Sequence, residues 1–476
     1  MRRSISSYFY SSVSTCAAIL FLILLAGCSL TPKYTQPEIS YSDKWSENGA
    51  EKDAINLSRF SDEDFWKSFR NEELTLLVNE GLKNNYDLKA AIQRIEQARA
   101  QARIAGAGLY PQASATGDVS YSVEKPDGRK LKGIDSSSAG LDISYELDLW
   151  GGIRAGRNSA LASFQASEFD YQALALVLKS DIVSAYIQAL ALQDRIKVTR
   201  QNYENSLKIL DIIEARFREG LDTALEVAQQ RTEIANTEST LISLEQSLKT
   251  TLNQLAILEG KAPQDFSIEG QSLSSLSLPS IAPEQPSSLL QRRPDLKSAE
   301  ATLRAANADI GVARAELYPS INLGLSPSLA ASSPVTNLTS MVLSMAASLY
   351  APIFQGGKLE GQVQLSEAKK EELVETYLQS ILTAFNETED ALVATKSSSE
   401  NLKATETAAD QANLSYKLAE ALYKEGATDF INLLQAQVSV LQTEDNLVQA
   451  RLAQYQAALD LYKAMGGGWV SNQADM

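Results

Sequence analysis

The chain carries Phe-Arg-Glu-Gly at residues 217–220 and Tyr-Lys-Glu-Gly at residues 423–426, roughly 205 residues apart. Two further landmarks recur in the same order at nearly the same separation: Leu-Tyr-Pro at 109–111 and 317–319, and Trp-Gly-Gly at 150–152 against Gln-Gly-Gly at 355–357. The chain therefore reads as two copies of one long unit. Such a duplication is typical of a scaffold, a tube or a transporter rather than of an enzyme with a single pocket.

A very long helix is predicted before the glycine that ends each Glu-Gly landmark. Residues 153–219 and 358–425 contain no proline and only one early glycine each. A helix of that length would extend about 100 Å at 1.5 Å per residue, whereas average helices have about 11–12 residues. Gly220 and Gly426 are expected to end the two helices.

Shorter helices are predicted on either side of each long one. Return helices would cover about 221–259 and 427–465, and helices before the strands about 82–107 and 297–316. Two short helices together match one long helix, so the simplest geometry stacks them end to end beside it. The last helix has a heptad spacing that predicts a left-handed supercoiled seam. Its apolar members are Leu434, Val438, Leu441, Val448, Leu452, Tyr455, Leu459 and Tyr462, with one break at Asp445.

Four stretches of alternating sequence predict β-strands, at about 113–123, 141–149, 320–329 and 340–349. The second reads Leu-Asp-Ile-Ser-Tyr-Glu-Leu-Asp-Leu and follows a loop predicted at about 124–138. Its acidic residues Asp142, Glu146 and Asp148 would share one face, which could point into water. The length and alternation suit transmembrane strands.

Four strands per chain imply an oligomer if the strands enter a membrane. They cannot close a barrel alone, and an open edge in lipid would leave backbone N–H and C=O groups unpaired. Either the strands form a small soluble sheet, or several protomers pool them. Three protomers would supply twelve strands, which leaves room for a lumen.

The N-terminus has the pattern of a signal peptide over residues 1–27. Arg2 and Arg3 precede an apolar run at 17–25 that is too short to span a bilayer as a helix. The run ends in Leu-Ala-Gly-Cys, which resembles a bacterial lipobox and makes Cys28 the expected lipidation site. The alternative is an ordinary secretory signal with a chance cysteine. Residues 28–70 are expected to form an extended lead-in.

The composition excludes several kinds of chemistry. The chain has two cysteines, of which the signal peptide would remove Cys16 and acylation would block Cys28, and it has no histidine. The commonest general base and nitrogen ligand for metals are therefore missing, and we expect no cofactor, no metal site and no enzymatic activity. The formal net charge of -16 disfavours nucleic acid as a partner. No stretch after the signal approaches the apolar length of a transmembrane helix.

These features together resemble the TolC-type outer membrane factors, in particular the NodT-type efflux lipoproteins that serve RND pumps. The resemblance covers about residues 28–468. Arg-Arg-Pro-Asp-Leu at 292–296 looks like a signature of that branch, and it is also a sound helix start, with proline in the first turn and an acid after it. Residues 308–320, Ala-Asp-Ile-Gly-Val-Ala-Arg-Ala-Glu-Leu-Tyr-Pro-Ser, resemble the family closely.

The resemblance implies a mainly α fold with a transmembrane β part. A homotrimer would form a twelve-stranded β-barrel in the outer membrane, continued by a twelve-helix α-barrel in the periplasm. The expected parts are a first repeat at 71–260, an equatorial segment at 261–296 and a second repeat at 297–468. The equatorial region would be mixed α/β and would include the C-terminal tail at 469–476.

The resemblance also implies a role for the two hairpin tips. The tips at Gly220, Leu221, Gly426 and Ala427 would contact a periplasmic adaptor, also called a membrane fusion protein. An RND-type inner membrane transporter would be the further partner. The outer membrane lipid would surround the strands and hold the anchor at Cys28.

A periplasmic gate is implied at the same tips. Family positions place a hydrogen bond between Tyr423 and Glu226, although packing for Tyr423 and a solvated surface for Glu226 are the simpler readings. The family's acidic rings fall on Asn432 and Gln435 here, which are neutral, so no acidic ring is expected at those levels. The constriction charge would then come from Glu226, Asp222 and Asp429.

The expected function is a passive outer membrane conduit of a tripartite pump, which exports small molecules from the periplasm to the outside. No Walker-type nucleotide loop is present, so the inner membrane partner would supply the energy. One alternative is a channel for type I protein secretion, and another is a structural coiled-coil lipoprotein without a pore. A third is a carboxylate-dependent hydrolase using the acidic cluster at 62–64, which is more simply a solvated surface.

Overall fold

The computed structural model describes residues 29–42, 44–46, 55–56, 62–124, 132–279, 281–282, 285–332 and 339–468. The expected signal peptide, Cys28 and the tail at 469–476 lie outside these residues. The described chain forms two compact units, and each is treated by itself. The first, here the strand unit, contains the described residues within 1–38, 93–168 and 298–378. The second, here the tip unit, contains those within 39–92, 169–297 and 379–476.

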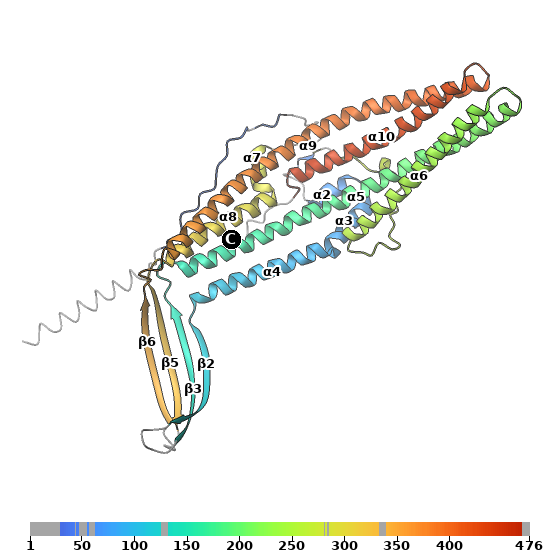
Figure 1. The fold of residues 1–476 in the computed structure, drawn as a ribbon. Coiled ribbons are helices and arrows are strands. Elements are labelled where there is room, and N and C mark those ends of the chain that lie inside the picture. The colour runs from blue at the N-terminus through green and yellow to red at the C-terminus, as the bar shows by residue number, and fades with distance from the viewer. Residues whose placement is uncertain are drawn as a thin grey trace, which may run out of the picture. The chain divides into compact units, whose positions relative to one another are not determined.

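The two repeats produce helices of identical length (Figure 1). Helices α5 (Gly152–Arg218) and α9 (Lys358–Lys424) have 67 residues each. The return helices α6 (Ala224–Leu258) and α10 (Phe430–Ala464) have 35 residues each. All four begin and end within about three residues of the predicted bounds. The repeated sequence therefore gives a repeated backbone.

The shorter helices begin at polar or proline residues that satisfy their first turns. Helix α3 (Glu72–Asn84) starts after Asn71, whose side chain accepts from the N–H of Leu74. Helix α4 (Tyr86–Gly106) is separated from α3 because Asn85 leaves the helical conformation and its side chain caps the next helix. The helix expected at about 82–107 ran through this break. Helix α8 (Pro294–Ala315) starts at a proline, as expected.

The strands form one antiparallel sheet with the order β2-β3-β5-β6. They are β2 (Gln112–Glu124), β3 (Lys132–Glu146), β5 (Ser320–Ser332) and β6 (Thr339–Tyr350). The prediction for β3 was wrong at both ends. Its serine-rich first half, taken for a loop, pairs with β2 and β5, because backbone ladders need no apolar side chain. Its C-terminal end stops before Asp148, whose carboxylate accepts from the N–H groups of Ile153 and Arg154 at the start of α5.

The register gives the sheet one polar and one apolar face. Residues opposite each other in the ladder share a face, so Ser114 pairs with Asp142, and Glu146 with Asn322, on the polar side. The Oγ atom of Ser326 donates to Asp142 at 2.8 Å on the same face. The other face carries large exposed apolar side chains: Val119, Tyr121, Val123, Leu141, Leu323, Leu329, Met341, Leu343, Met345 and Leu349. This alternation is the pattern of strands with lipid on one side and water on the other.

An aromatic core forms in the tip unit around the end of α10. The ring of Phe65 stacks on Tyr462 at 3.7 Å between centroids, and Trp66 meets Tyr462 edge-on. Phe65 and Trp66 belong to helix α2 (Asp62–Ser68), within the lead-in that was expected to be extended. The correction follows from the spacing of Phe65, Trp66 and Phe69, which places three buried rings on one helical face. The acidic stretch 62–64 forms the first turn of α2.

A small mixed α/β region joins this core, here called the equatorial region. Strand β1 (Ile55–Asn56) pairs in parallel with β4 (Ile281–Ala282), and helix α7 (Pro286–Arg292) follows. The buried guanidinium of Arg293 donates to Glu387 at 2.7 Å, to Asp295 and to the carbonyl of Ala464. Arg292 donates to the carbonyl of Gly467 at 2.9 Å. The Arg-Arg-Pro-Asp stretch thus ties the end of α10 to α9.

The predicted heptad seam of α10 is correct only in its equatorial half. Val448, Tyr455, Leu459 and Tyr462 are buried. Toward the tip, Leu433, Gln437 and Val440 are buried, each one position earlier than the predicted seam residue, while Val438 is 42% exposed. The shift occurs because a hydrogen-bonded glutamine belongs to the buried stripe, and a purely apolar pattern cannot include it.

Helix α5 contains a stretch that is long and apolar enough to cross a bilayer by length and composition. The sequence analysis had expected none after the signal. Half of that stretch is buried inside the structure, and Ile182, Val183 and Tyr186 are core residues. Partial burial of this kind is also typical of a helix that packs in a protein core.

Candidate functional site

The two hairpin tips have the same backbone geometry. Gly220 and Gly426 both have φ of +73°, a conformation that glycine adopts without steric cost. At each tip the residue after the glycine donates back to a carbonyl five residues earlier, from Leu221 to Arg216 and from Ala427 to Leu422. These are the bonds of a helix-ending Schellman motif. Gly220, Leu221, Gly426 and Ala427 are all exposed, as contacts with a partner require.

A buried contact joins the tips of the two repeats. The hydroxyl of Tyr423 on α9 donates to Asp222 Oδ2 at 2.5 Å. The Nε atom of Arg216 on α5 donates to the same carboxylate at 3.0 Å, and its guanidinium lies 4.8 Å from the Tyr423 ring centroid. Tyr423 is 2% exposed, and the Asp222 side chain 4%. Burial, together with the bond to Asp222, raises the pKa of Tyr423, so its hydroxyl stays protonated as the donor.

The predicted pairing of Tyr423 with Glu226 is therefore wrong, because Asp222 takes that place. Glu226 instead accepts from the backbone N–H of Thr223 at 2.5 Å, and Thr223 caps the start of α6 in return. This capping box was readable as Thr-x-x-Glu at 223–226. Asp429 is the N-cap residue of α10 and is exposed. Of the three proposed constriction carboxylates, only Asp222 is joined to Tyr423 by a hydrogen bond.

An apolar cluster lies next to the Tyr423–Asp222 contact on the side away from the tips. Beyond it lie polar layers that the sequence did not predict. The cluster contains Ile209, Ile213, Tyr423, Phe430 and Leu433. The first polar layer follows one turn further from the tip. The side-chain amides of Gln230 and Gln437 both donate to Ser206, to its carbonyl at 2.9 Å and to its hydroxyl at 2.5 Å.

Two further polar layers continue along the same interface between the repeats. Glu444 on α10 accepts from Asn202 on α5 at 3.2 Å and from Asn413 on α9 at 3.1 Å. Arg195 on α5 pairs with Asp445 on α10 at 2.6 Å. Asp445, the residue that breaks the heptad pattern, was the one sequence signal for these layers. Together they hold α5 and α10 in one register.

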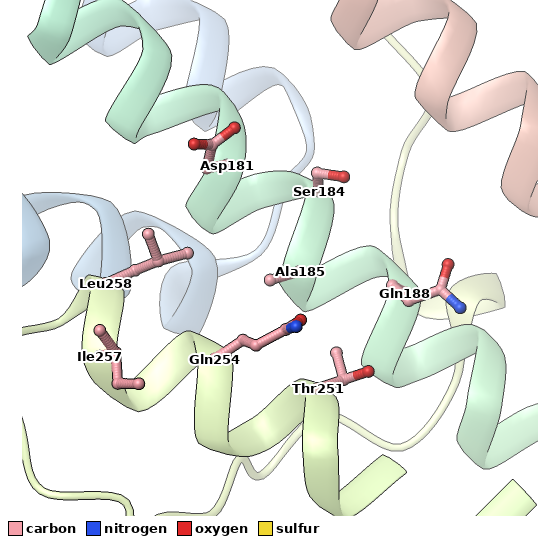
Figure 2. A pocket seen from close by; sticks show the side chains of 8 residues that line it. All are labelled: Asp181, Ser184, Ala185, Gln188, Thr251, Gln254, Ile257 and Leu258. Atoms are coloured by element: carbon pink, nitrogen blue, oxygen red, sulfur yellow. The ribbon is translucent and has the colours of Figure 1, made fainter. Parts of the chain in front are cut away.

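A groove of about 440 Å³, lined by both polar and apolar side chains, runs between α5 and α6 (Figure 2). Asp181, Ser184 and Gln188 on α5 line it together with Thr251 and Gln254 on α6, as labelled in Figure 2. Burial raises the pKa of Asp181, and Lys463 opposes that shift. The groove brings together one carboxylate and neutral amides. Among the residues that the structure describes, no three His, Cys, Asp or Glu are placed to hold a metal ion.

Comparisons with known proteins agree with this architecture. The family model described as outer membrane efflux protein matches residues 77–261 and 285–467, one match for each repeat. The pyoverdine export outer membrane protein OpmQ of Pseudomonas aeruginosa is 37% identical over 472 residues, covering 97% of this chain and 98% of OpmQ. The cation efflux system protein CusC of Escherichia coli is 30% identical, covering 96% of this chain and 100% of CusC.

Solved structures give the same answer at the level of the fold. The CmeC outer membrane channel of Campylobacter jejuni matches with a TM-score of 0.84 and 26% identity. The match covers 94% of this chain and 96% of the CmeC chain. The sheet with one polar face, the paired long hairpins and both halves of the family model point the same way, and the chain belongs to the outer membrane efflux protein family.

Proposed function

We propose that the chain forms a passive trimeric conduit whose periplasmic end is held shut by the contact of Tyr423 with Asp222 and Arg216. The family supplies the setting, in which the outer membrane channel of a tripartite efflux pump works with a periplasmic adaptor and an RND-type inner membrane transporter. The observation that carries the proposed gate is the buried hydrogen bond from one repeat to the other at the tips. Opening would separate the end of α9 from the end of α5 and the turn that follows it, while the polar layers behind keep their register.

The remaining site residues take supporting roles in this proposal. The exposed tips at Gly220, Leu221, Gly426 and Ala427 meet the adaptor. Acyl chains on Cys28 anchor the chain in the outer membrane. The first repeat (71–260), the equatorial segment (261–296) and the second repeat (297–468) are the working parts. The conduit catalyses nothing, and the inner membrane partner supplies the energy.

The relatives differ in the cargo that their names give. OpmQ is named for pyoverdine export and CusC for cation efflux. Such a range suits a water-lined conduit that does not choose its cargo strongly. We therefore propose small molecules in general as the cargo, with selection at the inner membrane transporter. The name of OpmQ, with its 37% identity, favours small organic molecules.

Two measurements test the conduit. Cells that lack the gene should accumulate more of a fluorescent dye than cells that carry it, and re-expression should restore export. The purified protein in a planar bilayer should form a trimeric pore. A monomeric protein without conductance would support the structural-lipoprotein alternative instead. Conductance without any change in dye accumulation would move the protein-secretion alternative forward.

A further inference from the structure

We propose that a cavity where the strand sheet joins the helices binds drug-sized amphipathic organic cations. The cavity has a volume of about 600 Å³ and lies entirely within the strand unit. Its walls come from the ends of β3, β5 and β6 and from the adjoining parts of α4, α5, α8 and α9. Cavities of this size accommodate small organic ligands. The inference rests on the proposed conduit and adds a binding site inside it.

The register of the sheet places this cavity on the water side. Glu146, Ser320 and Tyr350 line it. Glu146 is opposite Asn322, and Ser320 is opposite Tyr350, so all belong to the polar face that Asp142 marks. In a channel whose polar face lines the lumen, a solute in transit would therefore reach the cavity.

An aromatic pair forms one wall of the cavity. The indole of Trp150 stacks on Tyr318 with 4.7 Å between ring centroids, and its Nε1 donates to the carbonyl of Pro319 at 2.8 Å. The hydrogen bond fixes the ring orientation. Tyr318 remains 42% exposed and Tyr350 62%, so aromatic faces are open to a solute. Aromatic faces attract organic cations and also accept flat apolar groups.

The charges at the rim favour cations. Glu146 and Glu316 line the cavity and are exposed, whereas Lys358 is the only cationic residue among the described residues that line it. Asp148 also lines the cavity, but Arg154 and the start of α5 already neutralise it. Since the carboxylates outnumber the lysine, the local potential is negative. An anionic solute of the same shape would meet repulsion.

Binding of two dyes of similar shape and opposite charge tests the proposal. We would measure fluorescence anisotropy of rhodamine 6G, a cation, and of fluorescein, an anion, with the full-length protein in nanodiscs of zwitterionic lipid, subtracting empty nanodiscs. Rhodamine 6G should bind more tightly. Replacing both Glu146→Gln and Glu316→Gln should raise its Kd by about tenfold, the size expected for two carboxylates at several ångströms in a partly wet site. Lys358→Gln should lower the Kd.

Control variants separate this site from a general effect of charge. Glu371→Gln with Glu375→Gln removes two carboxylates from α9 outside the cavity and should leave the Kd unchanged. Trp150→Phe keeps an aromatic ring but loses the hydrogen bond to Pro319, and it should weaken binding less than Trp150→Leu. Equal affinity for the two dyes, or an unchanged Kd after the Glu146 and Glu316 replacements, would overturn the proposal. Conductance of the same samples keeps the two inferences distinct, because a conducting pore with no dye preference refutes only the cavity.

Discussion

Replacing Tyr423 by phenylalanine should make the isolated channel leak. The change removes the hydroxyl that donates to Asp222 at 2.5 Å. It keeps the ring, whose centroid lies 6.1 Å from that of the Phe430 ring. A hydrogen bond to a charged partner contributes about 1.5–3 kcal/mol. Asp222 keeps its contact with Arg216 at 3.0 Å, so the lower part of that range, about 2 kcal/mol, is the better expectation for each protomer.

The trimer multiplies this effect if its tips open together. Three copies would weaken the closed state by about 6 kcal/mol, and about 1.4 kcal/mol corresponds to a tenfold change in an equilibrium constant. The closed-to-open equilibrium would then shift by roughly 10⁴. If the protomers open independently, each shifts by only about 30-fold. The size of the leak therefore reports on cooperativity between the tips as well as on the bond.

Single-channel recording in planar bilayers, without adaptor, measures this directly. Tyr416→Phe is the matched control, because Tyr416 packs against the same apolar cluster and the change again removes one hydroxyl. Asp222→Asn should leak more than Tyr423→Phe, since it also weakens the contact with Arg216. Combining both changes should add little to Asp222→Asn alone, because the two residues share one interaction. The reasoning is refuted if Tyr423→Phe stays as closed as the wild type or leaks no more than Tyr416→Phe.

Three further predictions concern the tips and the equatorial region. Glu226→Gln should leave the leak near the wild-type level, since glutamine also completes a capping box, whereas Thr223→Ala should destabilise α6 by about 1 kcal/mol and lower the thermal melting temperature. Arg293→Met should lower that temperature by several degrees, because it removes the buried donor to Glu387 and one of the two donors to the Ala464 carbonyl. Burial raises the pKa of Glu259 to about 7; its stabilising protonation is present at acidic pH and lost as the pH rises through that value. Because the folded state holds this proton more tightly than the unfolded state only between the two pKa values, Glu259→Gln should flatten the fall in melting temperature between about pH 4.5 and 7.

The arrangement of the long helices was predictable from the sequence where a single residue type determines the backbone conformation. Gly220 and Gly426 end the long helices because glycine adopts a positive φ. Strands β5 and β6 were also predictable, because alternating residues along a strand point to opposite faces of the sheet. The hydrogen-bond partners of individual carboxylates were harder to predict. Asp148 was predicted to be a strand residue, but its carboxylate caps α5. The backbone of the turn before the helix determines which donors this carboxylate can reach.

The buried glutamines show a second limit of sequence reading. Gln230 and Gln437 are fully buried, yet both are polar, so an apolar pattern assigns them to the surface. Their position becomes predictable only when Ser206 is known to lie opposite them. The one-residue shift of the α10 seam has the same cause. Buried polar residues between packed helices specify how the helices are aligned along their length. A hydrophobic pattern alone does not determine that alignment.

The divergence of the two repeats explains why a duplicated hairpin can form a gate. Both tips share a glycine with φ of +73° and helices of equal length. The residue equivalent to Tyr423 in the first repeat is Phe217, which lacks the hydroxyl and is 44% exposed, while Tyr423 is 2% exposed. The first repeat supplies Asp222 and Arg216, and the second supplies the donor. The two hairpins thus share one backbone geometry but differ in their side chains, so the hydrogen bond between them has its donor in the second repeat and its acceptor in the first. Removing that one hydroxyl should release the hairpins from each other without changing the fold of either.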